Sequence, residues 1–199
     1  MELAVVLGRT ISFALAAGVN VYATVALIGL AVRFGWVDLP PQYDTFGSDV
    51  VIGAAVVMYL LEFFADKIPY VDTLWDLVHT VIRPVGGAFI AVTSLGDASP
   101  GAATLAALAG GAVAASSHLT KASTRAVANT SPEPFSNWAL SLAEDVFAFG
   151  LGYLALTYPL AALGVALGVL ACILAFSMVI LRLASRWLGR WRQPAPALH

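Results

Sequence analysis

The chain has 199 residues, of which 60% are hydrophobic and 11% are charged, and its formal net charge is −2. A soluble domain carries about 25% charged residues, so this chain has too few to cover a surface that faces water. Its basic residues are not gathered into a patch, which argues against a nucleic-acid partner. The single cysteine, Cys172, excludes an intrachain disulfide and a cysteine metal cluster. The composition therefore predicts an integral membrane protein whose first partner is the lipid bilayer.

Six segments are apolar and long enough, or nearly so, to cross a bilayer, which takes about 20 helical residues. They cover residues 10–32, 49–66, 72–96, 101–121, 136–157 and 160–184. The first is expected to be one retained helix rather than a signal peptide, because its apolar run continues from Tyr22 to Val32. We expect an all-α polytopic protein of six transmembrane helices, or five plus a re-entrant segment. It would form a single domain over residues 1–192, with a disordered tail over 193–199.

The lysines and arginines between the predicted spans fall mostly on one side of the membrane. With six spans the two termini share a side, and that side collects Arg9, Lys67 and most other basic residues, while the opposite side holds only Arg33. Cytoplasmic loops of membrane proteins carry the excess of lysine and arginine. Both termini are therefore predicted to be cytoplasmic in a multi-pass protein of the cytoplasmic membrane.

The segment EFFADKIPYVDTLWDLVHTVIRP, residues 62–84, concentrates charge between two apolar runs. Glu62 and Asp66 are four residues apart at the end of one predicted helix, so they lie on the same face. The next helix carries a polar stripe at helical spacing, formed by Asp72, Asp76, His79 and Arg83. Asp72 is also a candidate cap of that helix. Lipid cannot satisfy such a stripe, so we expect it to face the interior of the bundle or water.

A second polar set lies around the end of the fourth predicted helix, where a polar break over residues 121–137 begins, and in the fifth predicted helix. Its members are His118, Lys121, Arg125, Asn137, Ser141, Glu144 and Asp145. A charged residue at the centre of a membrane helix costs about 2.5–3.5 kcal/mol, so Arg83, Glu144 and Asp145 are expected to be paired. Lys121 is expected to extend its stem toward the lipid headgroups. The second and third predicted helices and the fourth and fifth share a layout typical of duplicated hairpins.

Three further elements predict irregular or close-packed helices. In AGVNVYAT, residues 17–24, Asn20 and Thr24 share a face and need hydrogen-bond partners inside the bundle. In RPVGGAF, residues 83–89, Pro84 removes a backbone hydrogen bond and predicts a kink or a break. Glycines at 110 and 111, and at 164 and 168, predict close helix contacts or a homodimer face.

Three motifs together resemble a bacterial integral-membrane family classed as a domain of unknown function, of the 4126 type. They are Gly-Val-Asn-Val-Tyr at 18–22, Glu-Phe-Phe-Ala-Asp-Lys-Ile-Pro-Tyr-Val-Asp at 62–72 and Arg-Pro-Val-Gly-Gly-Ala at 83–88. The resemblance covers nearly the whole chain. The family commonly has proline after the asparagine of the first motif, where this chain has Val21. The resemblance implies an all-α membrane fold in a bacterial inner membrane and adds no mechanism.

The leading functional hypothesis is a small transporter or channel-like protein with a cytoplasm-facing charged seam. The seam would handle a proton, a cation or a small polar solute. Its predicted pathway residues are Asn20, Glu62, Asp66, Asp72, Asp76, His79, Arg83, His118, Lys121, Arg125, Glu144 and Asp145. The acids from 62 to 76 would form an open vestibule with His79 and Arg83 deeper inside, and Glu144 and Asp145 would supply counter-charge or a coupling site. The histidines are candidate proton carriers because histidine titrates near neutral pH.

Two other functions stay open. The charged residues could form a buried ion-pair network that only holds helices together, in a structural or assembly protein. They could also serve as acid and base in an intramembrane enzyme acting on lipid headgroups, although SSHLTKAST, residues 116–124, supplies serines without a triad. A metal site built from Glu62, Asp76 and His79 lacks an HExxH motif or a clustered spacing. We therefore predict no catalytic residue, no metal and no cofactor.

Overall fold

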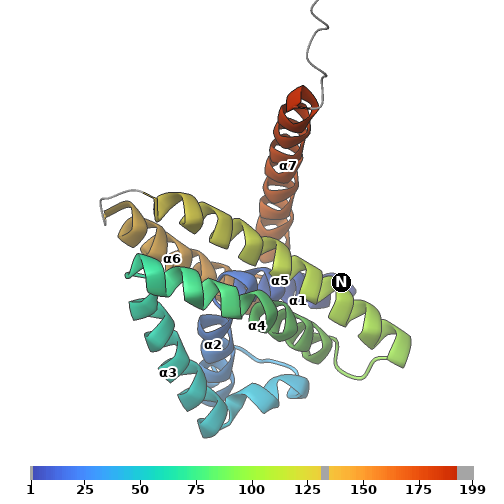
Figure 1. The fold of residues 1–199 in the computed structure, drawn as a ribbon. Helices are drawn as coiled ribbons and strands as arrows, with labels where there is room; N and C mark the ends of the chain where they lie inside the picture. The colour runs from blue at the N-terminus through green and yellow to red at the C-terminus, as the bar shows by residue number, and fades with distance from the viewer. Residues whose placement is uncertain (1, 131–134, 192–199) are drawn as a thin grey trace, which may run out of the picture.

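The computed structural model describes residues 2–130 and 135–191, and these residues form seven α-helices and one short 3-10 helix (Figure 1). In chain order the elements are α1 (Glu2–Val19), α2 (Val21–Phe34), η1 (Pro41–Gly47), α3 (Asp49–Ala65), α4 (Pro69–Leu95), α5 (Pro100–Ala128), α6 (Phe135–Thr157) and α7 (Pro159–Trp191). The described residues contain no strand, which confirms the all-α class. The tail predicted to be disordered, 193–199, lies outside the described residues.

Five of the described helices are long and apolar enough to cross a membrane, namely α1, α4, α5, α6 and α7. Counting η1 and α3 as one span bent by 61° gives a sixth, whereas α2 is apolar but has only 14 residues. The chain therefore has the architecture of an all-α polytopic protein, with the number of spans that the sequence predicts.

The first predicted span, 10–32, is not one continuous helix. It breaks at Asn20, whose φ of −151° and ψ of 99° are extended, and the chain restarts as α2. The Asn20 side chain accepts a hydrogen bond from the backbone N–H of Ala23, which caps α2. The break occurs here with Val21 in the place where the family commonly has proline, so the asparagine cap is sufficient to start the second helix.

The other predicted spans lie close to α3, α4, α6 and α7, and α4 continues through Pro84 without a break. The prediction for α5 was too short by two turns, because the polar residues after position 121 were assigned to a loop. That helix continues to Ala128, and Lys121 and Arg125 within its last turns are buried. Polar sequence ended the prediction early because these side chains face protein rather than water.

Helix α1 lies at the centre of the molecule and contacts α4, α5, α6 and α7. Its residues 12–19 are all buried. Five of them are small, at positions 12, 14 and 16–18, which lets the neighbouring helices approach closely. The larger side chains Phe13 and Leu15 pack into a core shared with α2, η1, α4 and α6. The hydrophobic core is therefore built around α1.

Helices α4 and α5 run antiparallel along most of their length, side by side (Figure 1). Small residues allow this approach, because a Cβ atom added to Gly110 would overlap Ala91 and lie 2.7 Å from the carbonyl oxygen of Gly87. The predicted contact at Gly110 is thus made within the chain. By contrast, Gly164 and Gly168 of α7 have open space beside them.

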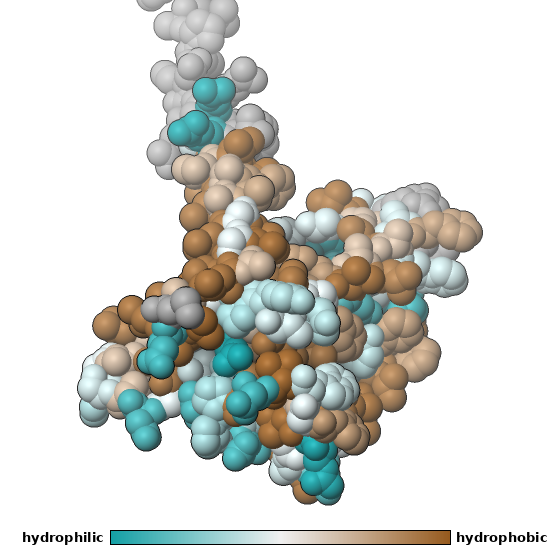
Figure 2. Space-filling view, turned by 180° about the vertical axis from the view of Figure 1, so that it is seen from behind, coloured by the Kyte–Doolittle hydropathy of each residue, from teal (hydrophilic) through white to brown (hydrophobic). Residues whose placement is uncertain are grey.

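Helix α7 projects from the bundle, as Figure 1 shows, and its packing differs from that of the other long helices. The apolar window of α7 is only 6% buried, compared with 56% for α1. The exposed residues include Leu174, Phe176 and Leu181. The surface of the projecting helix is hydrophobic along most of its visible length (Figure 2). This surface suits contact with lipid hydrocarbon.

Candidate functional site

Eight charged side chains meet in the interior of the bundle, and together we call them the charged cluster. They are Glu62, Asp66, Asp72, Asp76, Arg83, Lys121, Arg125 and Glu144. Four helices, α3 to α6, and the turn between α3 and α4 bring together residues up to 82 positions apart, because α5 ends and α6 begins beside that turn. All are buried except Glu144, whose side chain is 14% exposed.

Arg83 of α4 occupies the deep end of the cluster. One guanidinium nitrogen lies 2.8 Å from Glu62 of α3, and the other lies 3.4 Å from Asp76, two turns earlier on α4. The side chains of Arg83 and Glu62 are both 0% exposed. A buried ion pair is stable only when its remaining polar atoms are also satisfied. The carbonyl of Gly18 and the ring of His118 supply further partners for Arg83.

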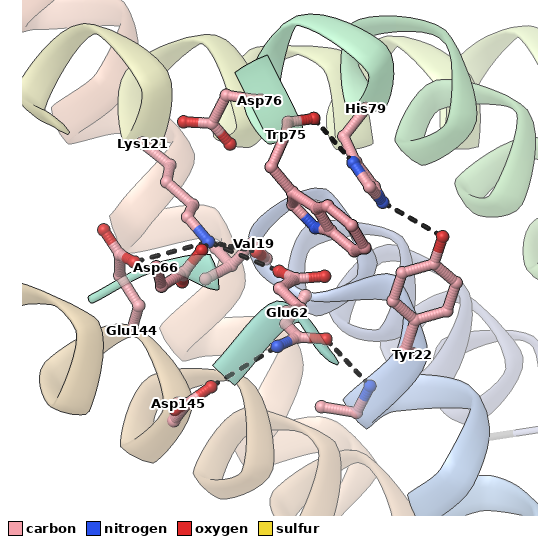
Figure 3. Close-up of polar contacts among 12 residues, drawn as sticks. Val19, Tyr22, Glu62, Asp66, Trp75, Asp76, His79, Lys121, Glu144 and Asp145 are labelled. Carbon is pink, nitrogen blue, oxygen red and sulfur yellow. Dashed lines mark hydrogen bonds and ion pairs between the residues drawn. The ribbon is translucent and has the colours of Figure 1, made fainter. Parts of the chain in front are cut away.

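Lys121 of α5 occupies the middle of the cluster and points toward three carboxylates (Figure 3). Its Nζ lies 3.1 Å from Asp66, 3.4 Å from Glu62 and 3.4 Å from Glu144. The expectation that Lys121 would reach the lipid headgroups is therefore wrong. The lysine lies on the face of α5 that packs inward, and three acids compensate its buried charge.

Arg125, one turn further along α5, ties the two charged turns together. Its guanidinium lies 2.8 Å from Asp66 and 3.2 Å from Glu144, and it also donates to the side chain and backbone of Asn137. Burial alone would raise the pKa of Asp66, which lies between α3 and α4. Lys121 and Arg125 outweigh that effect and hold the pKa of Asp66 below its ordinary value.

The cluster holds more carboxylates than cations. Five carboxylates surround three cations, which leaves a formal excess of two negative charges. Several carboxylate oxygens in the cluster are buried without a hydrogen-bond partner among the described residues, including one each on Glu62, Asp66 and Asp76. Buried charges without compensation cost several kcal/mol each, which is a large part of the total stability of a protein, about 5–15 kcal/mol. The arrangement therefore has room for bound protons or for a further cation.

The break between α1 and α2 delivers backbone groups to this cluster. An interrupted helix leaves its last carbonyls without intrahelical partners. Here the carbonyl of Gly18 accepts from Arg83 at 3.4 Å and that of Val19 accepts from Lys121 at 3.3 Å. The negative end of the α1 dipole also favours cations at this position. The break at Asn20 is thus part of how the cluster is built.

The hydrogen bonds of His118 define its protonation state. Its Nδ1 lies 2.8 Å from a guanidinium nitrogen of Arg83, which can only donate, so Nδ1 accepts. Its Nε2 therefore carries the proton and donates to the hydroxyl of Thr80 at 3.1 Å, which in turn donates to the carbonyl of Asp76. A second proton on this ring would face the guanidinium. His118 is consequently a fixed neutral link, and the expectation that it carries protons does not fit this geometry.

His79 lies beside the cluster and makes a separate chain of hydrogen bonds (Figure 3). Its Nδ1 donates to the carbonyl of Trp75 at 2.7 Å, and its Nε2 lies 3.0 Å from the hydroxyl of Tyr22 on α2. The Tyr22 hydroxyl can either donate to this nitrogen or accept from it. Both protonation states of His79 are therefore compatible with the same geometry.

Asn20 and Asp145 form a pair next to the cluster. The side-chain amide of Asn20 donates to one Asp145 oxygen at 3.3 Å, while the other oxygen is buried without a hydrogen-bond partner. The sequence predicted an ionic partner for Asp145. No cation lies within salt-bridge distance of it among the described residues, so the amide at the helix break takes that place.

Two small cavities reach the cluster on different sides of α5. One, of about 280 Å3, lies between α5, α6 and α7, and Lys121 and Glu144 line it. The other, of about 270 Å3, lies between α4 and α5, and its lining includes Asp72, Asp76 and Arg125. Both cavities have mostly apolar walls with the charged groups at one side.

The structure corrects two parts of the predicted pathway. The acids from 62 to 76 do not form an open vestibule, because they are buried and alternate with cations. Asp72 does not cap α4, which begins three residues earlier and is preceded by Ile68 at the cap position. Instead Asp72 accepts from Asn129 at 2.8 Å and lies 3.6 Å from Arg125.

All twelve predicted residues lie in or beside the cluster, and the sequence reasoning missed some of their partners. Thr80 and Asn129 were not identified, although Thr80 lies one turn after Asp76 on the same polar stripe. Trp75 was not identified either, and its backbone carbonyl accepts from His79 and orients that ring. The described residues contain no group of three His, Cys, Asp or Glu side chains placed to hold a metal ion.

Comparison with known proteins identifies a family without a described activity. No curated protein and no solved structure matches the chain. The family model described as Domain of unknown function (DUF4126) matches residues 7–179, which include the whole charged cluster and both cavities. This agrees with the resemblance of the three sequence motifs. The chain belongs to the family described as Domain of unknown function (DUF4126).

Proposed function

We propose that the protein is a small membrane transporter whose charged cluster binds and releases protons during its cycle. The membrane would be the bacterial cytoplasmic membrane, with both termini on the cytoplasmic side. The observation that carries this proposal is that the cluster holds five carboxylates, four of them buried, and only three cations. Ionisable residues inside a membrane protein are costly, and they commonly mark ion pathways and proton relays.

The broken helix supports a transport role. Transporters commonly place their binding sites at interrupted membrane helices, whose free carbonyls meet cations near the middle of the bilayer. Asn20 divides the first span at such a point, and the freed carbonyls of Gly18 and Val19 meet Arg83 and Lys121. A scaffold could pack an unbroken helix here, so the break favours transport over a purely structural role.

The two cavities support access to the cluster from two directions. Glu144 lines the cavity beside α7 and Asp76 lines the cavity beside α4, so different carboxylates face different spaces. Lys121 and Arg125 lie between them and contact acids on both sides. A shift of either lysine or arginine toward one side would change which carboxylate is left to take up a proton.

A pH jump applied to proteoliposomes on a solid-supported membrane tests this proposal, because proton binding inside the membrane displaces charge. Wild-type protein is expected to give a transient current that protein-free liposomes do not give. The variant Glu144→Gln should reduce this current, while Glu2→Gln, the same chemical change at an exposed position, should leave it unchanged. Equal currents from wild-type and protein-free liposomes would contradict the proposal.

The second candidate function is structural, and one observation favours it. Lys121 and Arg125, both on α5, contact carboxylates of α3, α4, α6 and the turn between α3 and α4. Such a network can fix helix positions without moving a solute. It predicts that Arg83→Ala lowers the melting temperature in detergent, while the pH jump gives no current in any variant.

A further inference from the structure

The cavity between α4 and α5 has the chemistry of a cation site. Its polar lining includes Asp72 and Asp76, which lie one helical turn apart on the same side of α4. Arg125 also lines the cavity, but its guanidinium is held by Asp66 and Glu144. Asp72 lies 3.6 Å from this guanidinium and accepts from Asn129. By contrast, the only charged contact of Asp76 among the described residues, Arg83, does not line the cavity.

Asp76 is the residue that points to a ligand. Its side chain is only 8% exposed, yet one of its oxygens, Oδ1, is buried without a hydrogen-bond partner among the described residues. Its one charged contact is Arg83 at 3.4 Å, and Arg83 makes a shorter ion pair, 2.8 Å, with Glu62. A buried carboxylate normally accepts several hydrogen bonds, and leaving them unmade is costly. A donor from outside the chain would complete this site.

The surroundings of Asp76 favour an ammonium group over a metal ion. Ca2+ takes six to eight oxygen ligands, but this cavity offers two carboxylates, and the described residues contain no metal-binding group of three. A primary ammonium has three N–H donors, which can serve Asp76 and Asp72, each of which has one oxygen without a hydrogen bond among the described residues.

The rest of the cavity fits a short alkyl chain. Leu77 and Ala122 belong to its apolar wall, and its volume of about 270 Å3 exceeds what an ammonium ion alone would fill. A water molecule occupies about 30 Å3 in the liquid, so the space corresponds to a molecule of several heavy atoms. The charged end would lie at Asp76 and the carbon chain along the apolar wall.

We propose that this cavity binds a small protonated primary amine, with its ammonium on Asp76 and Asp72 and its alkyl part against Leu77 and Ala122. The inference rests on the proposed transport function in that the bound amine would be the transported cation. It would also offset part of the negative excess of the cluster. Binding itself, however, requires no transport and can be measured separately.

Isothermal titration of the full-length protein in detergent, at constant ionic strength, tests the proposal with defined probes. Propylammonium is expected to bind more tightly than ammonium, because it also fills the apolar part. Tetramethylammonium has the same charge but no N–H donor, so it should give no saturable binding. Sodium, tested separately, should also give none. Asp76→Asn should weaken propylammonium binding by about tenfold or more, since a hydrogen bond to a charged group is lost. Asp97→Asn, an exposed aspartate at the other end of α4, should not change it.

Ala122→Phe provides a second test that leaves every charge in place. The phenyl ring should fill the apolar part of the cavity and weaken the binding of propylammonium more than that of ammonium. This variant tests the site even if Asp76→Asn does not fold. Equal propylammonium affinity in wild type and a folded Asp76→Asn, or equal affinities for propylammonium and tetramethylammonium, would overturn the site. A pH-jump current without amine binding would overturn the amine site and leave the proposed transport function in place. Amine binding without a pH-jump current would support the amine site and overturn the proposed transport function.

Discussion

The charged cluster and α7 are opposite kinds of structure in one chain. In the cluster, Arg83 and Glu62 are fully buried, while on α7 Leu181 is 68% exposed. A soluble protein would place these residues the other way round. This inverted pattern is the one expected for a protein surrounded by hydrocarbon, where an exposed leucine costs nothing and an exposed charge costs several kcal/mol. Residues of the cluster therefore stabilise one another, and the apolar surface of α7 suits contact with lipid.

This contrast predicts which substitutions matter. A cluster residue has partners that remain buried when it is removed, so its loss leaves charges uncompensated. An apolar residue on the outer face of α7 can be exchanged for another apolar residue with little effect, because hydrocarbon surrounds both. The predictions below compare the two regions, beginning with the largest expected change.

Arg83→Ala should have the largest effect on stability. It leaves Glu62 buried beside Lys121 alone and removes a partner of Asp76 and His118. Breaking a buried ion pair by removing one member costs about 3–5 kcal/mol. We therefore expect a large drop in the melting temperature in detergent, as measured by circular dichroism.

The matched control is Arg33→Ala, which breaks an exposed pair. Arg33 lies 3.3 Å from Asp49, and the two side chains are 55% and 79% exposed. An exposed pair contributes about 0–1 kcal/mol, so this variant should melt close to the wild type. Similar losses in the two variants would mean that the cluster is not more desolvated than the surface, against the contrast drawn above.

Leu167→Asp reverses the character of α7 and should have the next largest effect. Leu167 is 51% exposed in the apolar part of the helix. An acidic residue near the centre of a membrane helix costs about 2.5–3.5 kcal/mol on insertion. The variant should lose protein from the membrane fraction, while Leu167→Ala should accumulate normally. Normal membrane accumulation of the aspartate variant would show that this face of α7 does not meet lipid.

The sequence predicted the spans well because length and hydropathy report directly on what a bilayer requires. It failed where local polarity and tertiary position disagree. The polar end of α5 was read as a loop, although Lys121 and Arg125 are buried there. The break at Asn20 was also missed, because hydropathy does not change across it and only the side-chain cap to Ala23 reveals it.

For the candidate site, spacing was informative and pairing was not. Intervals of three and four predicted that Asp76 and Arg83 share a face, and both face inward. Which acid pairs with which base depends on how α3, α5 and α6 pack against α4. The spacing of residues within each helix does not predict this packing between helices. For this reason the leading hypothesis placed the acids in an open vestibule, a buried ion-pair network stood as the alternative, and the central position of Lys121 was not predicted.

Gly110→Val should destabilise the pair of α4 and α5 by about 1–3 kcal/mol, as expected for overpacking. A larger side chain at this position would press on Ala91 and on the backbone at Gly87. Gly164 has open space beside it. The same substitution there should change the free energy of unfolding by no more than a surface substitution does, about 0.5 kcal/mol. A strong effect at Gly164 in the membrane, with none in dilute detergent, would indicate that α7 packs against a second copy.

The smallest expected change is the pH dependence contributed by Asp66. Lys121 and Arg125 outweigh the effect of burial and keep the pKa of Asp66 below its ordinary value. Because the folded-state pKa is lowered, the stabilisation is present above the unfolded pKa of about 3.9 and is lost as the pH falls through the folded value. The difference in melting temperature between wild type and Asp66→Asn should therefore stay constant from about pH 8 to pH 5 and narrow below about pH 4. A difference that changes near neutral pH would mean that Asp66 itself exchanges protons there. A constant difference identifies it as a permanent anion of the cluster, so any proton exchange near neutral pH must occur at the other carboxylates.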